Sequence, residues 1–199
     1  RLRSMAFTRK DLRWPMPIAA LQDLAGSRCT HIDRRSKYLL VGFDDANRSI
    51  GIVHLGMSGR LFVDVVGMRS KRPEWERHEH WRMDFGDRLA RYVDPRRFGS
   101  LDVTDAASAE THPLLGKLGP EPLTEVFDAE YLFAITRRRK AAIKTFLMDA
   151  TNVVGVGNIY ASEACFRARV RPTHAAGRMR RIDCERLVRA IREVLEAAI

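Results

Sequence analysis

The sequence predicts an α+β protein in which an antiparallel β-sandwich with short helices precedes a helical domain. In the first half, short apolar runs alternate with polar turns, which is typical of antiparallel strands. In the second half, apolar residues recur at helical spacing, and a Gly/Pro-rich loop at 115–123 separates the two halves. We therefore expect a β domain at 1–112, a linker at 113–126 and a helical domain at 127–199.

The expected strands are apolar runs that end at turn residues. A short helix is expected at 18–25, after Pro15 and Pro17. The turn cluster at 44–49 and the pair Gly86-Asp87 favour hairpins between neighbouring strands. The polar stretch at 65–77 receives no assignment. The expected strands are YLLVGF (38–43), IGIVHL (50–55), RLFVDVV (60–66), HWRMDF (80–85) and RLARYV (88–93).

The second half predicts helices. Apolar residues lie near helical spacing from 130 to 149, and we expect a helix there. A clearer amphipathic helix follows near the end of the chain, and we interpret its apolar stripe as core without assigning it a function. The stripe consists of Cys184, Leu187, Val188, Ile191, Val194 and Leu195.

Composition narrows the class of protein. A net charge of +10 suits a polyanionic partner such as nucleic acid, although a solvated basic surface explains the same charge. No run of about 18 apolar residues and no signal-peptide pattern occurs, so we expect a soluble cytoplasmic protein without a membrane partner. Cys29, Cys165 and Cys184 are odd in number and far apart, which argues against a disulfide framework or a zinc site in this stretch.

The stretch VVGVGNIYASE (153–163) predicts an anion site. Gly155 and Gly157 permit positive φ, and Asn158 is a favourable N-cap for the helix that follows. A helix N-terminus behind a glycine turn presents free backbone N–H groups to a phosphate. The cations at 137–140 and Lys144 precede it on the expected helix, which completes a candidate phosphate clamp.

Two other interpretations of this stretch remain. A dinucleotide fingerprint is not matched, because Tyr160 stands where a third glycine is required. A plain tight turn between helices explains the glycines equally well, and only the preceding cations favour phosphate binding.

Six motifs together resemble the bacterial formamidopyrimidine-DNA glycosylases. AIKTFLMD followed by GVGNIYASE is similar to that family's helix–two-turn–helix. The resemblance implies a β-sandwich domain, a helical domain with the phosphate-binding turn, and duplex DNA in a basic cleft between them. It favours the branch that acts on oxidised purines over the endonuclease VIII branch. The other motifs, in family order, are LRWP (12–15), RRSKYLL (34–40), HLGMSG (54–59), DPRRFG (94–99) and LGPEPL (118–123).

The resemblance implies an intercalating wedge formed by Met57, Arg96 and Phe98. Chemistry on a base requires that the nucleotide leave the stack, and apolar side chains then fill the gap. From the residues alone, sheet core is the more common location for apolar side chains such as Met57 and Phe98, and Arg96 fits a surface ion pair with Asp94.

Further roles follow from the resemblance. Lys37 matches a phosphate-contacting lysine that donates a proton in β-elimination, although a solvated strand-edge lysine is the simpler interpretation. His54 matches a phosphate-contacting histidine, with a core histidine as the alternative. His78 and His80 are too few to predict a metal site, so no metal ligand is expected in this chain. The positions expected to bind DNA are His54, His78, Arg139, Lys144, Gly157 and Asn158.

The function implied is a monomeric, nucleoid-associated base-excision repair glycosylase and AP lyase. It would remove 8-oxoguanine and formamidopyrimidines from duplex DNA or act at abasic sites. In the family an N-terminal proline amine attacks C1′, an adjacent glutamate assists, and a C-terminal finger binds zinc. The sequence opens at Arg1 without Pro-Glu and without four finger cysteines. We therefore expect the printed chain to be inactive and zinc to belong to a missing finger.

Two other functions remain open. A non-catalytic paralogue would bind lesions or abasic sites without cutting the strand. An RNA-binding protein is the third, although A-form RNA offers no comparable groove for a wedge.

Overall fold

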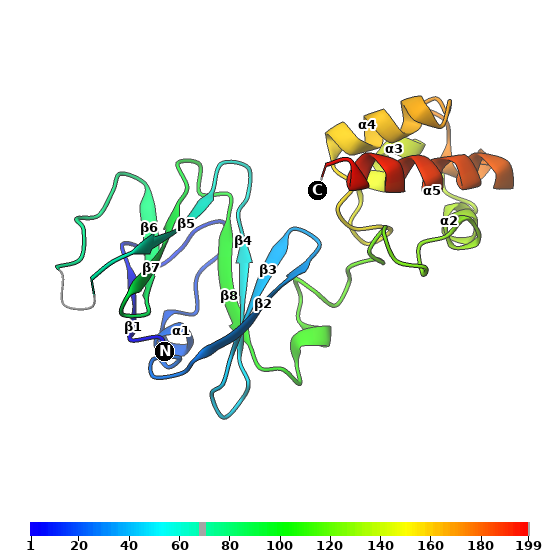
Figure 1. Ribbon diagram of the computed structural model, residues 1–199. Helices are drawn as coiled ribbons and strands as arrows, with labels where there is room; N and C mark the ends of the chain where they lie inside the picture. Colours follow the sequence, from blue (N-terminus) through cyan, green and yellow to red (C-terminus); the bar gives the residue numbers. More distant parts are fainter. Residues whose placement is uncertain (68–70, 199) are drawn as a thin grey trace. The chain divides into compact units, whose positions relative to one another are not determined.

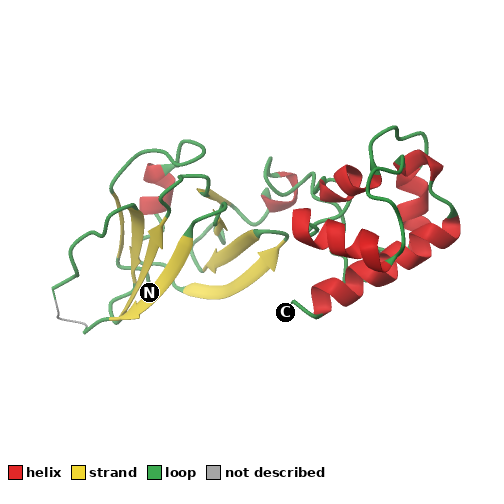
Figure 2. Cartoon of the chain, turned by 90° about the horizontal axis from the view of Figure 1, so that it is seen from above, coloured by secondary structure: helices red, strands yellow, loops and turns green. Residues whose placement is uncertain are grey.

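The computed structural model describes residues 1–67 and 71–198 and divides the chain into two compact units (Figure 1). The first unit, Arg1–His112, contains all the described strands, and the second, Pro113–Ile199, contains helices but no described strand (Figure 2).

The β unit is built from two four-stranded antiparallel sheets. One sheet has the order β1-β6-β7-β5, and the other has the order β2-β3-β4-β8. The first consists of β1 (Ser4–Phe7), β6 (Glu79–Asp84), β7 (Arg88–Val93) and β5 (Arg60–Val65). The second consists of β2 (Cys29–Arg35), β3 (Tyr38–Phe43), β4 (Ile50–His54) and β8 (Ser100–Thr104). A short helix α1 (Ile18–Gln22) and a 3₁₀ turn η1 (Ala109–Thr111) complete the unit.

A single apolar core fills the β unit. Trp81 of β6 and Tyr92 of β7 are buried and stacked, with ring centroids 5.2 Å apart. Leu21 of α1 is fully buried in the same core, which fixes the helix against the strands. Such burial of large apolar side chains is the main source of the unit's stability.

The expected strands are confirmed, with β3 and β7 starting and ending as predicted. β1, β2 and β8 were not predicted, because their sequences lack a continuous apolar run. Most of β2 is exposed, and the strand is held by backbone pairing with β3 rather than by burial of its side chains. Of the unassigned stretch at 65–77, residues 68–70 lie outside the described part of the chain.

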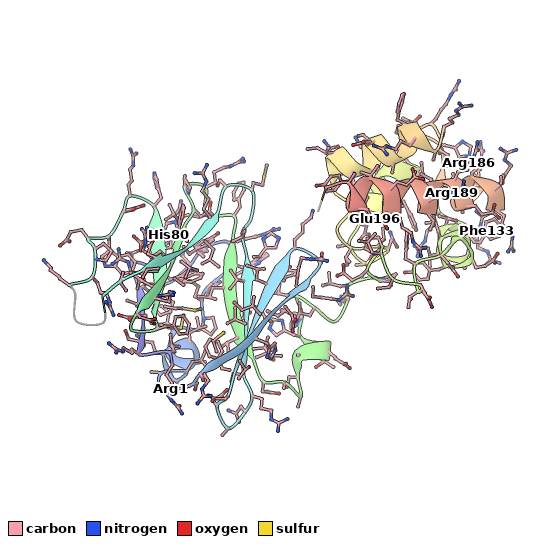
Figure 3. The ribbon with its side chains drawn as sticks, in the orientation of Figure 1. Arg1, His80, Phe133, Arg186, Arg189 and Glu196 are labelled. Atoms are coloured by element: carbon pink, nitrogen blue, oxygen red, sulfur yellow. The ribbon has the colours of Figure 1, made fainter. Side chains whose placement is uncertain are left out.

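The helical unit contains α2 (Ala129–Thr136), α3 (Ile143–Met148), α4 (Asn158–Arg167), a 3₁₀ turn η2 (Ala176–Arg178) and α5 (Arg181–Glu196). The predicted stripe of α5 is confirmed as core, since Cys184, Leu187 and Ile191 are buried. Polar side chains such as Arg189 and Glu196 project from its other face (Figure 3). Among the described helices, none has the length and apolar character that a bilayer span requires.

One helix prediction is wrong. The segment from 130 to 149 is two helices, because the chain leaves helical geometry at Arg137 and Arg138 has φ +60°. The connector then pairs with a distant segment, since Ala142 forms a bridge with Ala175 and the Gly177 amide donates to the Arg139 carbonyl at 2.9 Å. These tertiary hydrogen bonds replace the helical ones and outweigh the local apolar periodicity.

Candidate nucleic-acid interface

Two loops cross between the sheets at one end of the β unit. Loop 55–59 joins β4 to β5, and loop 94–99 joins β7 to β8. Strand register brings them together, because His54 pairs with Ser100 across β4 and β8. The β2–β3 hairpin ends beside them, since Tyr38 pairs with His54. Lys37, Met57 and the segment 96–98 therefore lie at the same end of the sandwich.

The two crossing loops touch backbone to backbone at Gly56. This residue has φ +69°, a conformation that favours glycine. A Cβ placed on it would lie 2.6 Å from the amide nitrogen of Gly99 and 2.6 Å from the carbonyl carbon of Phe98. Glycine at this position therefore serves both the turn and the close approach.

A buried carboxylate ties the loops together. Asp94 has no exposed surface. Its oxygens accept hydrogen bonds from the Ser58 hydroxyl at 2.6 Å and from the Gly99 amide at 2.9 Å. The Arg96 amide, at 3.2 Å, and the Tyr92 hydroxyl, at 3.1 Å, complete the set. Burial alone would raise the pKa of Asp94, but these hydrogen bonds outweigh it and lower the pKa.

The three predicted wedge residues project from these anchored loops. Met57 is 74% exposed and Phe98 is 42% exposed, so neither is sheet core. The guanidinium carbon of Arg96 lies 4.6 Å from the centroid of the Phe98 ring, in a cation–π contact. Asp94 bonds the backbone amide of Arg96, and no side-chain ion pair between them is seen in the described residues. Large apolar side chains held out on fixed loops are typical of a contact surface.

His54 is poised to donate a hydrogen bond. Its Nδ1 accepts from the Gly56 amide at 2.9 Å, which assigns the proton of the neutral ring to Nε2. Burial, and then the charges of Arg13 and Lys37, lower the pKa of His54 below 6.5. The ring is therefore neutral at neutral pH and can donate from Nε2 beside two cations.

Lys37 and His78 lie near the two wedge loops, 55–59 and 94–99. Lys37 is exposed in the turn that leads into β3. His78 is exposed, has φ +66°, and accepts a backbone hydrogen bond from the Asp94 amide at 2.9 Å. This contact places His78 at the start of the loop that carries Arg96 and Phe98.

The glycine stretch of the helical unit forms a turn that leads into α4. Gly155 has φ +77°, whereas Gly157 has φ −88° and does not use its conformational freedom. The prediction that Asn158 is the N-cap is wrong by one residue, because Gly157 holds that position and α4 begins at Asn158. Within the described parts of the chain, no acceptor is seen for the amides of residues 155–157. Such free N–H groups at a helix N-terminus suit a phosphate.

The cations of the helical unit are distributed differently from the prediction. The run 137–140 lies in the connector between α2 and α3, and Lys144 alone lies on α3. The exposed Arg139 lines a hollow of about 510 Å³, together with Arg138, Thr151 and Asn152. The connector therefore lies beside the start of the glycine turn although it is not a helix. Lys144 is half-buried and acts on the pKa of the buried Cys165, which burial raises and the lysine charge lowers.

No metal centre can be built from the residues that the structure describes. No group of three or more His, Cys, Asp or Glu side chains lies together among them. His80 is buried and its Nε2 lies 2.8 Å from the Asp94 carbonyl oxygen, so it is a structural partner of loop 94–99.

Sequence reasoning missed the centre of the β-unit site. It considered Asp94 only as an ion-pair partner of Arg96, and it gave no role to Ser58 or Tyr92. All three belong to or adjoin the motifs HLGMSG and DPRRFG, but their hydrogen bonds cross between segments 36 residues apart. No local pattern shows such a contact.

Two family profiles match most of the chain. The formamidopyrimidine-DNA glycosylase N-terminal domain matches residues 1–101, and the formamidopyrimidine-DNA glycosylase H2TH domain matches residues 118–199. Among curated relatives, the formamidopyrimidine-DNA glycosylase of Stenotrophomonas maltophilia (strain K279a) is 46% identical over 200 residues, covering 100% of this chain and 70% of the relative. That of Cellvibrio japonicus is 45% identical over 188 residues, covering 94% of this chain and 66% of the relative. The chain thus spans about two thirds of these relatives' length.

A solved structure shows the same fold. The complex between the Lactococcus lactis Fpg and DNA containing an abasic site matches with a TM-score of 0.85 and 30% sequence identity. The match covers 100% of this chain and 71% of that one.

Proposed function

Because this chain belongs to the formamidopyrimidine-DNA glycosylase family, we propose that it is the DNA-gripping part of a base-excision repair enzyme that removes oxidised purines. One observation carries the proposal. Met57, Arg96 and Phe98 are held in solvent on two loops that the buried Asp94 fixes. Exposure of large apolar side chains to water is unfavourable, so their position outside the core indicates a partner that covers them.

The proposed role of these three side chains is to replace a nucleotide that has left the duplex. Met57 is flexible and apolar, and it would enter the stack where the damaged base was. Phe98 presents a flat ring against the neighbouring base, and Arg96 would hydrogen-bond the unpaired partner base. The damaged base then becomes accessible to chemistry outside the helix.

We assign the grip on the DNA backbone to both units. In the β unit, Nε2 of His54 donates to a phosphate, and Lys37 and His78 supply further contacts. Lys37 would also deliver a proton during β-elimination. In the helical unit, Arg139, Lys144 and the amides around Gly157 and Asn158 take a second stretch of phosphates.

Bond cleavage itself requires a nucleophile that attacks C1′. In the proposed lyase mechanism, an amine forms an iminium with C1′, expels the damaged base, and allows elimination of the 3′ phosphate. We do not assign the attacking amine or a zinc-binding finger to any of these 199 residues. We therefore propose that these residues by themselves bind damaged duplex DNA, in a monomer, without excising the base.

The test measures binding of the chain to a duplex with a stable abasic analogue and to the matched undamaged duplex. The variant F98A should weaken binding to the abasic duplex by about 5- to 150-fold, since stacking of an aromatic ring on a base contributes roughly 1–3 kcal/mol. The variant M57A should weaken it as well, since the apolar contact of Met57 with the neighbouring bases is lost. The control V65A removes a side chain of similar exposure, 76%, at the far end of β5. Equal effects of M57A and V65A would overturn the wedge assignment.

A second assay separates the enzyme from a non-catalytic binder. The full-length protein is mixed with an 8-oxoguanine duplex and borohydride, which reduces an iminium to a stable adduct. An adduct supports the glycosylase and lyase. Tight binding to the abasic duplex without an adduct or strand cleavage supports the lesion-binding paralogue instead.

A further inference from the structure

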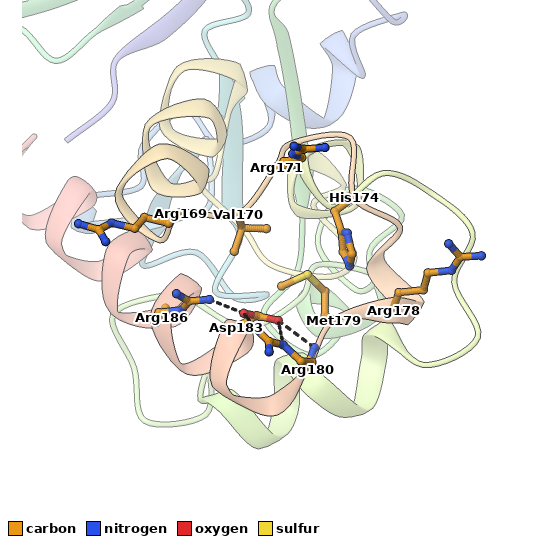
Figure 4. Close-up of a pocket in the computed structure, with 9 residues that line it drawn as sticks. All are labelled: Arg169, Val170, Arg171, His174, Arg178, Met179, Arg180, Asp183 and Arg186. Carbon is orange, nitrogen blue, oxygen red and sulfur yellow. Dashed lines mark hydrogen bonds and ion pairs between the residues drawn. The ribbon is translucent and has the colours of Figure 1, made fainter.

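The end of α4 and the start of α5 enclose a cationic pocket of about 340 Å³ in the helical unit (Figure 4). Its lining contains five arginines, one histidine and a single aspartate. We use the name arginine pocket for Arg169, Arg171, His174 and Arg178 around the apolar floor of Val170 and Met179. None of these residues belongs to the motifs discussed above.

The one acidic group of the pocket is fully engaged. Asp183 accepts hydrogen bonds from the Arg180 side chain at 2.9 and 3.1 Å, and it also pairs with Arg186. The same carboxylate accepts the backbone amide of Arg180, so the N-terminus of α5 has its own internal anion. Asp183 therefore leaves the charges of the other arginines uncompensated.

Three arginines of the pocket have no partner among the residues that the structure describes. The side chains of Arg169, Arg171 and Arg178 form no hydrogen bond or ion pair within the residues that the structure describes, and all three are exposed. Figure 4 shows them spread around Val170 and Met179, with their guanidinium groups reaching outward. Two other exposed arginines of the unit pair with acids, in Arg167–Glu163 and Arg181–Glu130. Unpaired guanidinium groups around one hollow offer charge and hydrogen-bond donors that suit a phosphate.

The pocket adjoins the proposed phosphate grip. The carbonyl of Pro172 accepts from the Lys144 amide at 3.1 Å, and the carbonyl of His174 accepts from the Ile143 amide at 2.8 Å. One short segment thus holds the first turn of α3 on one side and supplies Arg171 and His174 to the pocket. A strand that reaches Lys144 would pass close to the arginine pocket.

We propose that the arginine pocket is a second anion site of the helical unit and takes a phosphate group of the DNA strand outside the lesion. The DNA source rests on the proposed function above. A free mononucleotide carries the same phosphate chemistry, and its base would suit the apolar floor. The two sources are separated by experiment.

The test compares two double variants that remove equal charge. R171A/R178A removes two of the three free arginines of the arginine pocket, whereas the control R88A/R189A removes two exposed arginines outside it. The dependence of log Kd on log salt concentration is measured with an undamaged duplex long enough to extend about one turn on each side of a central site. Each phosphate contact contributes about 0.9 to this slope, so loss of the one phosphate that the pocket takes should lower the magnitude of the slope by about 0.9 in R171A/R178A. Melting curves confirm that both variants remain folded.

Titration of the ¹⁵N-labelled wild-type chain with inorganic phosphate and with a deoxynucleoside monophosphate identifies the source. A lower slope without mononucleotide binding assigns the pocket to the DNA backbone. Amide shifts at 169–180 that require Arg171 and Arg178, with an unchanged slope, assign it to a free nucleotide. Equal slopes for both double variants and no such shifts would overturn the anion site. These readouts need no lesion, so they stand apart from a failure of M57A to weaken abasic-site binding.

Discussion

Replacement of Asp94 by asparagine should destabilise the β unit by about 2–4 kcal/mol. The substitution keeps the shape of the side chain but removes its charge and exchanges one acceptor oxygen for a donor NH₂. Ser58 and Arg96 donate to one carboxylate oxygen, and Gly99 and Tyr92 lie at the other. Whichever way the amide turns, one backbone N–H then faces another donor in a site without exposed surface.

The magnitude follows from that geometry. A buried donor left without an acceptor costs about 1–3 kcal/mol, and hydrogen bonds to a charged group are worth roughly 1.5–3 kcal/mol each. The hydroxyls of Ser58 and Tyr92 can rotate and become acceptors, so they recover part of the loss, which limits the net change to about 2–4 kcal/mol. A domain of this size is stable by only about 5–15 kcal/mol, so the effect is measurable without abolishing the fold.

Tryptophan fluorescence during urea unfolding is a selective assay. All three tryptophans of the chain, Trp14, Trp75 and Trp81, lie in the β unit, so the signal does not report the helical unit. The control D87N changes an exposed aspartate in the β6–β7 turn and should shift the free energy of unfolding by less than about 0.5 kcal/mol.

The pH dependence gives a second check with a defined sign. Because hydrogen bonds lower the folded pKa of Asp94 below its ordinary value of 3.8, the stabilisation is fully present above that value. It is lost as the pH falls below it toward the folded pKa. The difference between wild type and D94N should therefore be constant between about pH 7 and pH 5 and shrink near pH 3. A destabilisation below about 0.5 kcal/mol, or one that grows on acidification, would refute the role given to Asp94.

Two further substitutions test the same physical account. G56A should destabilise the β unit by more than about 2 kcal/mol and weaken binding to the abasic duplex, since its Cβ would clash with the backbone of Gly99. G155A places a Cβ in open space at positive φ, so it should destabilise the helical unit by only about 1 kcal/mol. Thermal melts that show equal destabilisation by the two variants would contradict this difference. E79Q removes the charge of a fully buried side chain and leaves the charges of Arg82 and Arg91 partly uncompensated. Unfolding monitored by fluorescence should therefore show that the free energy of unfolding falls by about 3–5 kcal/mol. A change within about 0.5 kcal/mol would show that this ion pair is not buried in solution.

The fold class could be predicted from the sequence because it depends on local signals. Alternation of apolar residues and turn clusters placed β3, β4, β5, β6 and β7, and the 3.6-residue periodicity placed α5. These patterns can be read from the sequence without information about tertiary contacts. β2 carries no such signal, since its charged side chains face solvent and its partner strand supplies the hydrogen bonds. Strand pairing of that kind is visible only once the sheet exists.

The candidate site divides in the same way. Sequence motifs identified Met57, Arg96, Phe98, His54 and the glycine turn, because the resemblance to the family depends on residue identity and order. Exposure of the wedge is a tertiary property, since an apolar residue in a sheet-forming stretch fits a core equally well. The break between α2 and α3 is likewise tertiary, because bonds to residues 174–177 outweigh helical periodicity.

What the sequence determined by itself was therefore the set of elements and the chemical types available to the site. What only the tertiary structure decided was which of them meet. Asp94 and Ser58 lie 36 positions apart, yet one hydrogen bond joins the two wedge loops. Arg169, Arg171 and Arg178 form a pocket only where α4 ends beside the start of α5. The physical reason is that hydrogen bonds and charges act over a few ångströms in space, whatever their separation along the chain.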